Sequence, residues 1–306
     1  MERTLVMAIV MLVIYLVGWV QGVMPGGEIM RFGHSKDPKA LTYFDLGEFL
    51  RERQRMEVSQ RLEGASSICD RSDRRIRREV GDLSQLEWDS YADAVLAAKN
   101  AVDSSGRNII HQFAEFHDMF SNEAHGSPKF LCWHRWFIFY WESALRVFNP
   151  LVTLPYWDSA RDAANPRGAQ VFTETRAGSG ENGTNVLNGK FKNWNVTFAQ
   201  PHSVKRFLDE SILVENSSKI DALLNNSSGT CEFMRLFEVI HGFVHLFVGG
   251  WSLPRALNLP RGEMTQIQVS PNDLVFFLHQ YVVSTTWRKI EKLNKGVSQF
   301  IVSSWR

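Results

Sequence analysis

Apolar residues recur at helical spacing along much of the chain, which predicts a mainly α-helical protein. The spacing begins near Phe49 and becomes regular over residues 76–148, with one break at the Gly-Ser-Pro turn of residues 126–128. Two further apolar stretches, residues 232–248 and 272–293, predict helices toward the C-terminus. Most of the expected core therefore comes from helices and not from strands.

The part of the chain between these helical stretches is irregular in composition. Residues 160–230 are rich in Gly, Asn, Ser and Thr, and this predicts long loops with short helices such as residues 204–208. No internal repeat is present. We therefore expect one mainly α domain over residues 75–295, with long irregular loops and a C-terminal tail at residues 296–306.

The first residues have the pattern of a targeting segment. A charged start precedes an apolar run that ends in small residues, so residues 1–22 are interpreted as a signal peptide and residues 23–74 as an N-terminal extension. A short N-terminal membrane anchor is the alternative. A secreted or secretory-lumen glycoprotein is expected, because five glycosylation sequons cluster in the loop region: Asn182, Asn195, Asn216, Asn225 and Asn226.

The charge balance narrows the range of partners. The formal net charge is +1, whereas binding to nucleic acid or to an anionic membrane surface depends on a large positive charge. We therefore expect no nucleic-acid partner, and no membrane partner once the signal peptide has been cleaved.

Two histidines lie four residues apart in the apolar stretch of residues 232–248. His241 and His245 would project from one helix face toward a common point, as a metal requires. Two histidines on a partly buried helix face are the alternative interpretation. A zinc metalloprotease is disfavoured, because its motif places Glu directly after the first His, where this chain has Gly242.

A second histidine cluster lies earlier in the chain. His117 would end or follow a helix, His125 would lie on a loop, and His134 would open the next helix. Three imidazoles brought together in this way can form a metal site with an open coordination position.

The sequence around these histidines resembles the tyrosinase family of type-3 copper proteins, which includes catechol oxidases and molluscan haemocyanins. Residues 130–135 (Phe-Leu-Cys-Trp-His-Arg) are similar to a family signature that has Pro in place of Cys132. Residues 154–158 (Leu-Pro-Tyr-Trp-Asp) match a second signature, and residues 270–279 (Ser-Pro-Asn-Asp-Leu-Val-Phe-Phe-Leu-His) resemble a third. The resemblance covers about residues 75–290.

This resemblance implies a four-helix bundle that holds two copper ions, each bound by three histidines. His117, His125 and His134 map to the first site, and His241 and His245 map to the second. The third ligand of the second site is the second His of a His-His pair in the family, whereas this chain has His279-Gln280.

The replacement at residue 280 leaves three outcomes open. An amide oxygen is a weaker donor to Cu(I) than an imidazole, so Gln280 would give a weakened but occupied second site. Recruitment of His279 would require a register shift or bulge, because adjacent helical residues point about 100° apart. Loss of the second copper is the third outcome.

The resemblance also implies an activity. A type-3 copper oxidoreductase oxidises o-diphenols, and in some members monophenols, to o-quinones, with O2 and a small phenol as partners. Glu232 lies where many relatives hold a water that deprotonates the phenol, although a helix N-terminal acid is an equal interpretation. Asp158 and Glu142 are candidates for orienting ligand imidazoles.

Two other functions remain open at this point. A haemocyanin-like O2 carrier would bind O2 without turnover, and a degenerate family member would keep the fold for a structural or binding role. Gly242, which follows His241 where hydroxylating relatives often have Asn, favours diphenol oxidation over monophenol hydroxylation.

Overall fold

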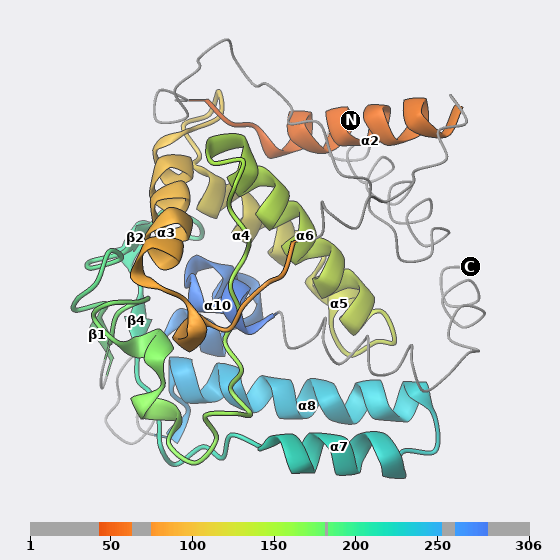
Figure 1. Ribbon diagram of the computed structural model, residues 1–306, viewed down its shortest axis with the longest axis vertical. Coiled ribbons are helices and arrows are strands. Elements are labelled where there is room, and N and C mark those ends of the chain that lie inside the picture. The colour runs from red at the N-terminus through yellow and green to blue at the C-terminus, as the bar shows by residue number, and fades with distance from the viewer. Residues whose placement is uncertain (1–42, 63–74, 181–182, 253–260, 281–306) are drawn as a thin grey trace.

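The computed structural model describes residues 43–62, 75–180, 183–252 and 261–280 (Figure 1). The expected signal peptide, most of the N-terminal extension, the C-terminal tail and the second half of the helix expected at residues 272–293 lie outside these residues. Their interpretation remains a prediction. Among the described helices, none combines the length and apolar character needed to cross a membrane.

The described chain is mostly helical, as the apolar spacing predicted. The α-helices are α2 (Leu46–Leu62), α3 (Gln85–Asn100), α4 (Ile109–Met119), α5 (Ser121–Ala124), α6 (Phe130–Phe148), α7 (Ser217–Asn226), α8 (Thr230–Gly249) and α10 (Val275–His279). Short 3-10 turns are η3 (Val80–Asp82), η4 (Pro166–Gly168), η5 (Gln170–Phe172), η6 (Glu263–Thr265) and η7 (Ile267–Asn272).

Local sequence signals explain where the central helices begin. The Ser84 side chain accepts a hydrogen bond from the Glu87 backbone N–H, and the Glu87 carboxylate accepts one from the Ser84 N–H, which together start α3. The Asn108 side chain accepts from the backbone N–H of His111 and starts α4. These caps fix the starts of two helices that pack into the core, and α4 carries His117.

The core is aromatic and is built mainly by α3, α4, α6 and α10. Trp141 of α6 stacks on Phe277 of α10 with ring centroids 3.9 Å apart, and Phe113 of α4 meets the Trp141 ring edge-on at 5.2 Å. Figure 1 shows α10 near the centre of the molecule, with α7 and α8 side by side along one edge. These ring contacts hold together α4, α6 and α10, three of the helices that carry candidate histidines.

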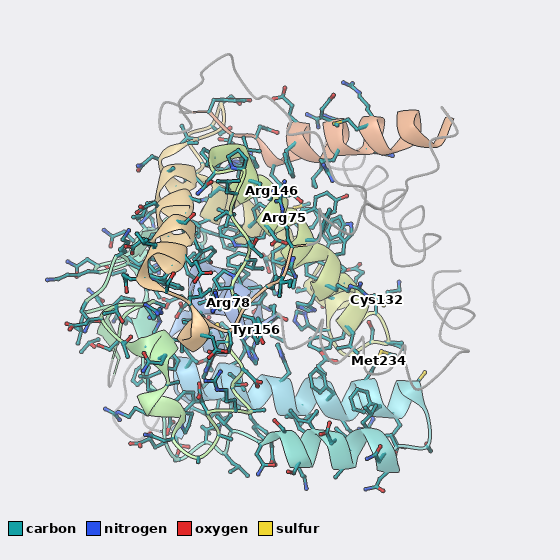
Figure 2. The ribbon with its side chains drawn as sticks, in the orientation of Figure 1. Arg75, Arg78, Cys132, Arg146, Tyr156 and Met234 are labelled. Carbon is teal, nitrogen blue, oxygen red and sulfur yellow. The ribbon has the colours of Figure 1, made fainter. Side chains whose placement is uncertain are left out.

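A separate apolar cluster joins α6 to α8. It includes Phe130 and Leu131 from α6 together with Phe233, Met234 and Phe237 from α8, and Cys132 packs against it. Figure 2 shows Cys132 and Met234 close together at this junction. The cluster fixes α8 next to the start of α6, which is where His134 lies.

Strand structure is limited in the described residues to two short antiparallel pairs. β1 (Thr184–Asn185) pairs with β4 (Lys205–Arg206), with Thr184 opposite Arg206. β2 (Asn195–Val196) pairs with β3 (His202–Ser203), with Asn195 opposite Ser203.

The prediction of a short helix at residues 204–208 is wrong. Arg206 instead belongs to β4, and its buried guanidinium binds both carboxylate oxygens of Asp273 at 2.6 and 2.7 Å and also donates to two backbone carbonyls. Leu208, with φ of 49°, also departs from helical backbone. Pairing of Arg206 with the segment before α10 overrides the local apolar pattern.

The loop region contains an α-helix, α7, whose polar composition gave no apolar pattern from which to predict it. Residues 160–230 are mostly irregular, as predicted, but α7 forms within them because the Asn216 side chain accepts from the Lys219 N–H at its start. The helix expected from residue 272 starts later, at Val275, because Asp273 is extended and follows a 3-10 turn that contains Pro271.

Candidate metal centre

The first three candidate ligands converge from two helices and a loop. His117 lies in the last turn of α4, His125 follows α5, and His134 lies near the start of α6. Each offers a ring nitrogen that lies within 4.8 Å of the other two. His117 and His134 are fully buried and His125 is half-buried, so His125 is the most exposed member of this triad.

Hydrogen bonds fix which nitrogen of two of these rings points into the triad. His134 Nδ1 donates to the carbonyl oxygen of Phe130, and His125 Nδ1 donates to that of Ser121, each at 2.9 Å. A carbonyl only accepts, so each ring carries its proton on Nδ1 and presents the lone pair of Nε2. His134 Nε2 has no hydrogen-bond partner among the described residues.

The His117 ring, the third member of the first triad, differs from His125 and His134 in its hydrogen bonding. Neither of its ring nitrogens makes a well-formed hydrogen bond among the described residues, where only the Ile267 backbone interacts with the ring, although the ring is fully buried. Leaving such polar atoms unpaired in an apolar interior costs roughly 1–3 kcal/mol each. A metal ion bound at the triad would remove that cost at one nitrogen, so the residues fit a metal.

The second set lies on α8 and α10. His241 Nε2 and His245 Nε2 face each other at 3.1 Å, and His245 Nδ1 donates to the Met264 carbonyl oxygen at 2.9 Å. Two nitrogens about 2.05 Å from one tetrahedral ion lie about 3.3 Å apart. The pair therefore already has the spacing that one ion requires.

The segment that presents Met264 is held by glycines. Gly249 ends α8, and a Cβ there would collide with the backbone nitrogen and the side chain of Thr265. Gly250, with φ of 80°, closes the helix in the left-handed region that favours glycine. These two glycines allow η6 to approach α8 closely enough for Met264 to orient His245.

The third position of this set is shared by two neighbouring residues. Proximity alone groups His279 with His241 and His245, since a ring nitrogen of each lies within 4.8 Å of the others. The His279 ring, however, stacks on His241 with centroids 4.2 Å apart, and its Nε2 points to the His241 carbonyl oxygen at 3.4 Å. Its Nδ1 has no hydrogen-bond partner among the described residues.

Gln280 reaches one of the two facing imidazole nitrogens. Its Nε2 lies 3.1 Å from His241 Nε2, the atom that faces His245, while its buried Oε1 has no hydrogen-bond partner among the described residues. The α10 helix ends at His279, and Gln280 keeps helical backbone angles. The structure thus brings both predicted third residues to His241 without a bulge.

The two triads adjoin one another across aromatic side chains. The His134 and His241 rings have centroids 6.4 Å apart, and Phe130 contacts both, at 4.7 and 5.1 Å. Phe276 packs against His117 at 5.1 Å and against His245 at 5.8 Å. Phe276 therefore lies between ligands of the two sets, and these rings shield them from solvent.

Burial sets the protonation state of these histidines. It lowers the pKa of His117, His134, His241 and His279 well below the ordinary value, with neighbouring histidines adding to the effect in each. Burial lowers the pKa of His245 to about 4 and also lowers that of His125. Neutral imidazoles are the form that binds metal ions.

Other predicted residues lie elsewhere. Glu142 pairs with Arg77 and accepts from the Leu154 N–H, and Asp158 accepts from the Arg161 N–H. The expectation that these two carboxylates orient ligand imidazoles is therefore wrong. Backbone carbonyls of Phe130, Ser121 and Met264 do so instead, and a backbone acceptor leaves no side-chain signal in the sequence.

Glu232 lies in the first turn of α8. Its Oε2 accepts hydrogen bonds from the N–H and the hydroxyl of Ser228, both at 2.6 Å, and these bonds lower its pKa. The position fits a helix N-terminal acid. Within the described part of the chain, these bonds hold Glu232 to Ser228 and not to either histidine set.

Comparison with known proteins agrees with this geometry. Residues 107–291, more than half of the chain, match the sequence profile of the common central domain of tyrosinase. The chain is 26% identical over 227 residues to the putative tyrosinase-like protein tyr-3 of Caenorhabditis elegans, 25% identical over 227 residues to Hemocyanin 1 of Megathura crenulata, and 29% identical over 240 residues to a tyrosinase of Streptomyces antibioticus. These matches cover 69%, 70% and 71% of this chain.

The relatives differ in how much of their own length is matched. The chain spans 30% of the Caenorhabditis protein, 6% of the haemocyanin and 83% of the tyrosinase. Among solved structures, a mutant polyphenol oxidase from Thermothelomyces thermophila superimposes with a TM-score of 0.64 at 21% identity, covering 79% of this chain and 77% of that one. This likeness concerns the fold.

Two buried histidine sets on helices that adjoin one another define a protein with a paired metal centre. The chain belongs to the tyrosinase family, whose members bind two copper ions.

Proposed function

We propose that this protein is a copper oxidoreductase that uses O2 to oxidise an o-diphenol to an o-quinone. The observation that carries the proposal is the pair of adjoining histidine sets, with buried unpartnered imidazole nitrogens in both. In the overall reaction two diphenols each lose two electrons and two protons, and one O2 takes them up to give two waters. Family membership supports the reaction class.

In this proposal His117, His125 and His134 hold one copper, and His241 and His245 hold the other. Gln280 takes the third position of the second set, because its amide reaches the His241 nitrogen that faces His245. His279 then acts as the ring that stacks beneath His241. Copper, when bound, supplies the electron-transfer chemistry and the affinity for O2.

The protein's own groups prepare the site for this chemistry. Carbonyl oxygens hold the His134 and His245 rings with Nε2 facing inward, and Phe276 and Phe130 exclude water from the space between the sets. The half-buried ligands His125 and His245 mark the side from which a phenol would approach.

Two further residues bear on the substrate step. Glu232 is the candidate for holding the water that takes the phenol proton, and its Oε1 is not engaged in the bonds from Ser228. Gly242 leaves open space, since a Cβ there would meet no atom within 4 Å. We expect Glu232→Gln to lower kcat without changing the copper content.

The proposal is tested by counting copper and following quinone formation on one preparation. Wild type should bind more than one copper per chain and convert catechol to quinone with O2 uptake. His134→Ala should lose both properties. His111→Ala is a matched control, because His111 lies on α4 outside both sets and its ring bonds to Thr197. Copper-loaded wild type that makes no quinone would exclude the oxidoreductase.

A second candidate is a family member with an impaired second site and a binding or structural role. The Gln280 amide favours it, because this amide occupies the place of a third imidazole. One copper per chain with no catechol oxidation is the result that selects it. Reversible O2 binding without quinone formation would select the haemocyanin-like function instead.

We also propose that the protein enters the secretory pathway. This proposal rests on the apolar residues 1–22 and the clustered sequons, all of which except Asn182 lie in the described region. Expression in a secreting host should yield a glycosylated chain that begins near residue 23. A cytosolic, unglycosylated chain that retains its initiating methionine would contradict it.

A further inference from the structure

A carboxylate on α8 holds the loop that carries a ligand of the first triad. Glu238 Oε1 accepts a hydrogen bond of 2.8 Å from the backbone N–H of Gly126, the residue directly after His125. The carboxylate is half-buried, and a hydrogen bond from a backbone N–H to a charged acceptor is stronger than one between neutral groups.

Glu238 belongs to the same helix face as the second histidine pair. It precedes His241 by three residues and His245 by seven, so all three side chains project to one side of α8. One helix face therefore provides two ligands of the second set and an anchor for the loop of the first.

Gly126 itself makes little packing contact, although the neighbouring His125 ring packs against His117 and His134. Gly126 has φ of 63°, and no heavy atom lies within 4 Å of where a Cβ would sit, so side-chain packing does not hold it. The His125 ring is oriented by Ser121, which lies within the same short segment and moves with it. In the described part of the chain, the Glu238 carboxylate joins this segment to α8 by a direct hydrogen bond.

We infer that Glu238 is a positioning residue that fixes His125 relative to α8 and thereby sets the separation of the two histidine sets. The inference deepens the proposed function and rests on it, since a paired metal centre reacts with O2 only when both metals are held at a defined separation. The carboxylate would act through the backbone of Gly126, since its hydrogen bond goes to that N–H and not to a candidate ligand ring of the described residues.

Two conservative variants of Glu238 separate the effect of side-chain length from the effect of its charge. Glu238→Asp keeps the charge but shortens the side chain by one methylene, so it cannot reach Gly126. Glu238→Gln keeps the length and an acceptor oxygen but loses the charge. Val239→Ala, at the exposed neighbouring position on α8, controls for general effects on the helix.

The first measurement is hydrogen exchange of the peptide that contains Gly126, on copper-free protein. We expect Glu238→Asp to speed exchange of the Gly126 amide by at least about 10-fold, because its acceptor is lost. Glu238→Gln and Val239→Ala should stay near the wild-type rate. Equal exchange in wild type and the Asp variant would overturn the inference, as would faster exchange in the Gln variant than in the Asp variant.

The second measurement is copper affinity by chelator competition. Groups that support metal ligands typically change affinity about 10- to 100-fold when altered, so Glu238→Asp should weaken the tighter copper by that factor and Glu238→Gln should retain it. An Asp variant with wild-type affinity would contradict the positioning role. Wild type that binds no copper would contradict the proposed function, whereas the exchange measurement would still decide whether Glu238 holds the loop.

Discussion

Replacing Gln280 with His tests how the second set is completed. In the copper-free protein the Gln280 amide nitrogen donates to His241 Nε2, while Oε1 is buried without a hydrogen-bond partner among the described residues. Copper bound to His241 would take the lone pair that this amide uses. Binding would then leave both polar atoms of the buried amide unpaired unless one of them reaches the metal.

The size of the effect follows from that loss. A buried polar group that loses its partner costs about 1–3 kcal/mol, which corresponds to about a 5- to 160-fold change in affinity. An imidazole at residue 280 has no such cost and adds a stronger donor for Cu(I). Gln280→His should therefore tighten the second copper by at least about 5-fold and raise bound copper toward two per chain.

The assay is a copper titration against a chelator, followed by catechol oxidation at equal copper loading. His279→Gln is the reciprocal variant, and it should leave the second copper in place if His279 only stacks on His241. An unchanged second copper in Gln280→His, together with its loss in His279→Gln, would refute this assignment. In that case His279 would be the third ligand through its unpartnered Nδ1.

Three other perturbations follow from the same geometry. His134→Ala should lower bound copper by about one per chain and abolish catechol oxidation, because its Nε2 lone pair faces the first triad; unchanged copper content would exclude this ligand. Gly249→Ala should lower the free energy of unfolding by about 1–3 kcal/mol and lower the affinity for the second copper. The added methyl group would collide with Thr265 and displace Met264 from His245. A wild-type melting temperature would contradict this prediction. The copper-free protein should lose stability as the pH falls from about 6.5 toward 4, by up to about 1.4 kcal/mol per pH unit for each buried histidine. The reason is that imidazoles bind protons in the unfolded chain in this range, whereas the lowered pKa of the buried imidazoles keeps them neutral in the folded protein. A flat melting temperature over this range would be inconsistent with buried neutral histidines.

The sequence predicted the helices and the candidate ligands whose signals are local. His241 and His245 share a helix face through their spacing alone, and the amphipathic pattern of α6 places His134 near its start. The convergence of His117, His125 and His134 came from resemblance to a family, because no local rule states that a helix end, a loop and a helix start will meet.

Features that depend on tertiary contacts could not be predicted in this way. Backbone carbonyls orient the ligand rings, and the position of Met264 depends on the close approach of η6 to Gly249. Within residues 204–208 a short strand, β4, replaces the predicted helix because Arg206 pairs with Asp273, which lies far along the chain. The contact of Gln280 with His241 also results from tertiary packing, since it joins α8 to the end of α10.

The central claim is that two coppers lie in the two histidine sets, the second more weakly held. The most direct measurement is a crystal structure of copper-loaded protein with anomalous diffraction at the copper edge. We expect a fully occupied peak among His117, His125 and His134, and a second, less occupied peak against His241 and His245 on the side of Gln280. A single peak outside both sets, or no peak at the first triad, would contradict it.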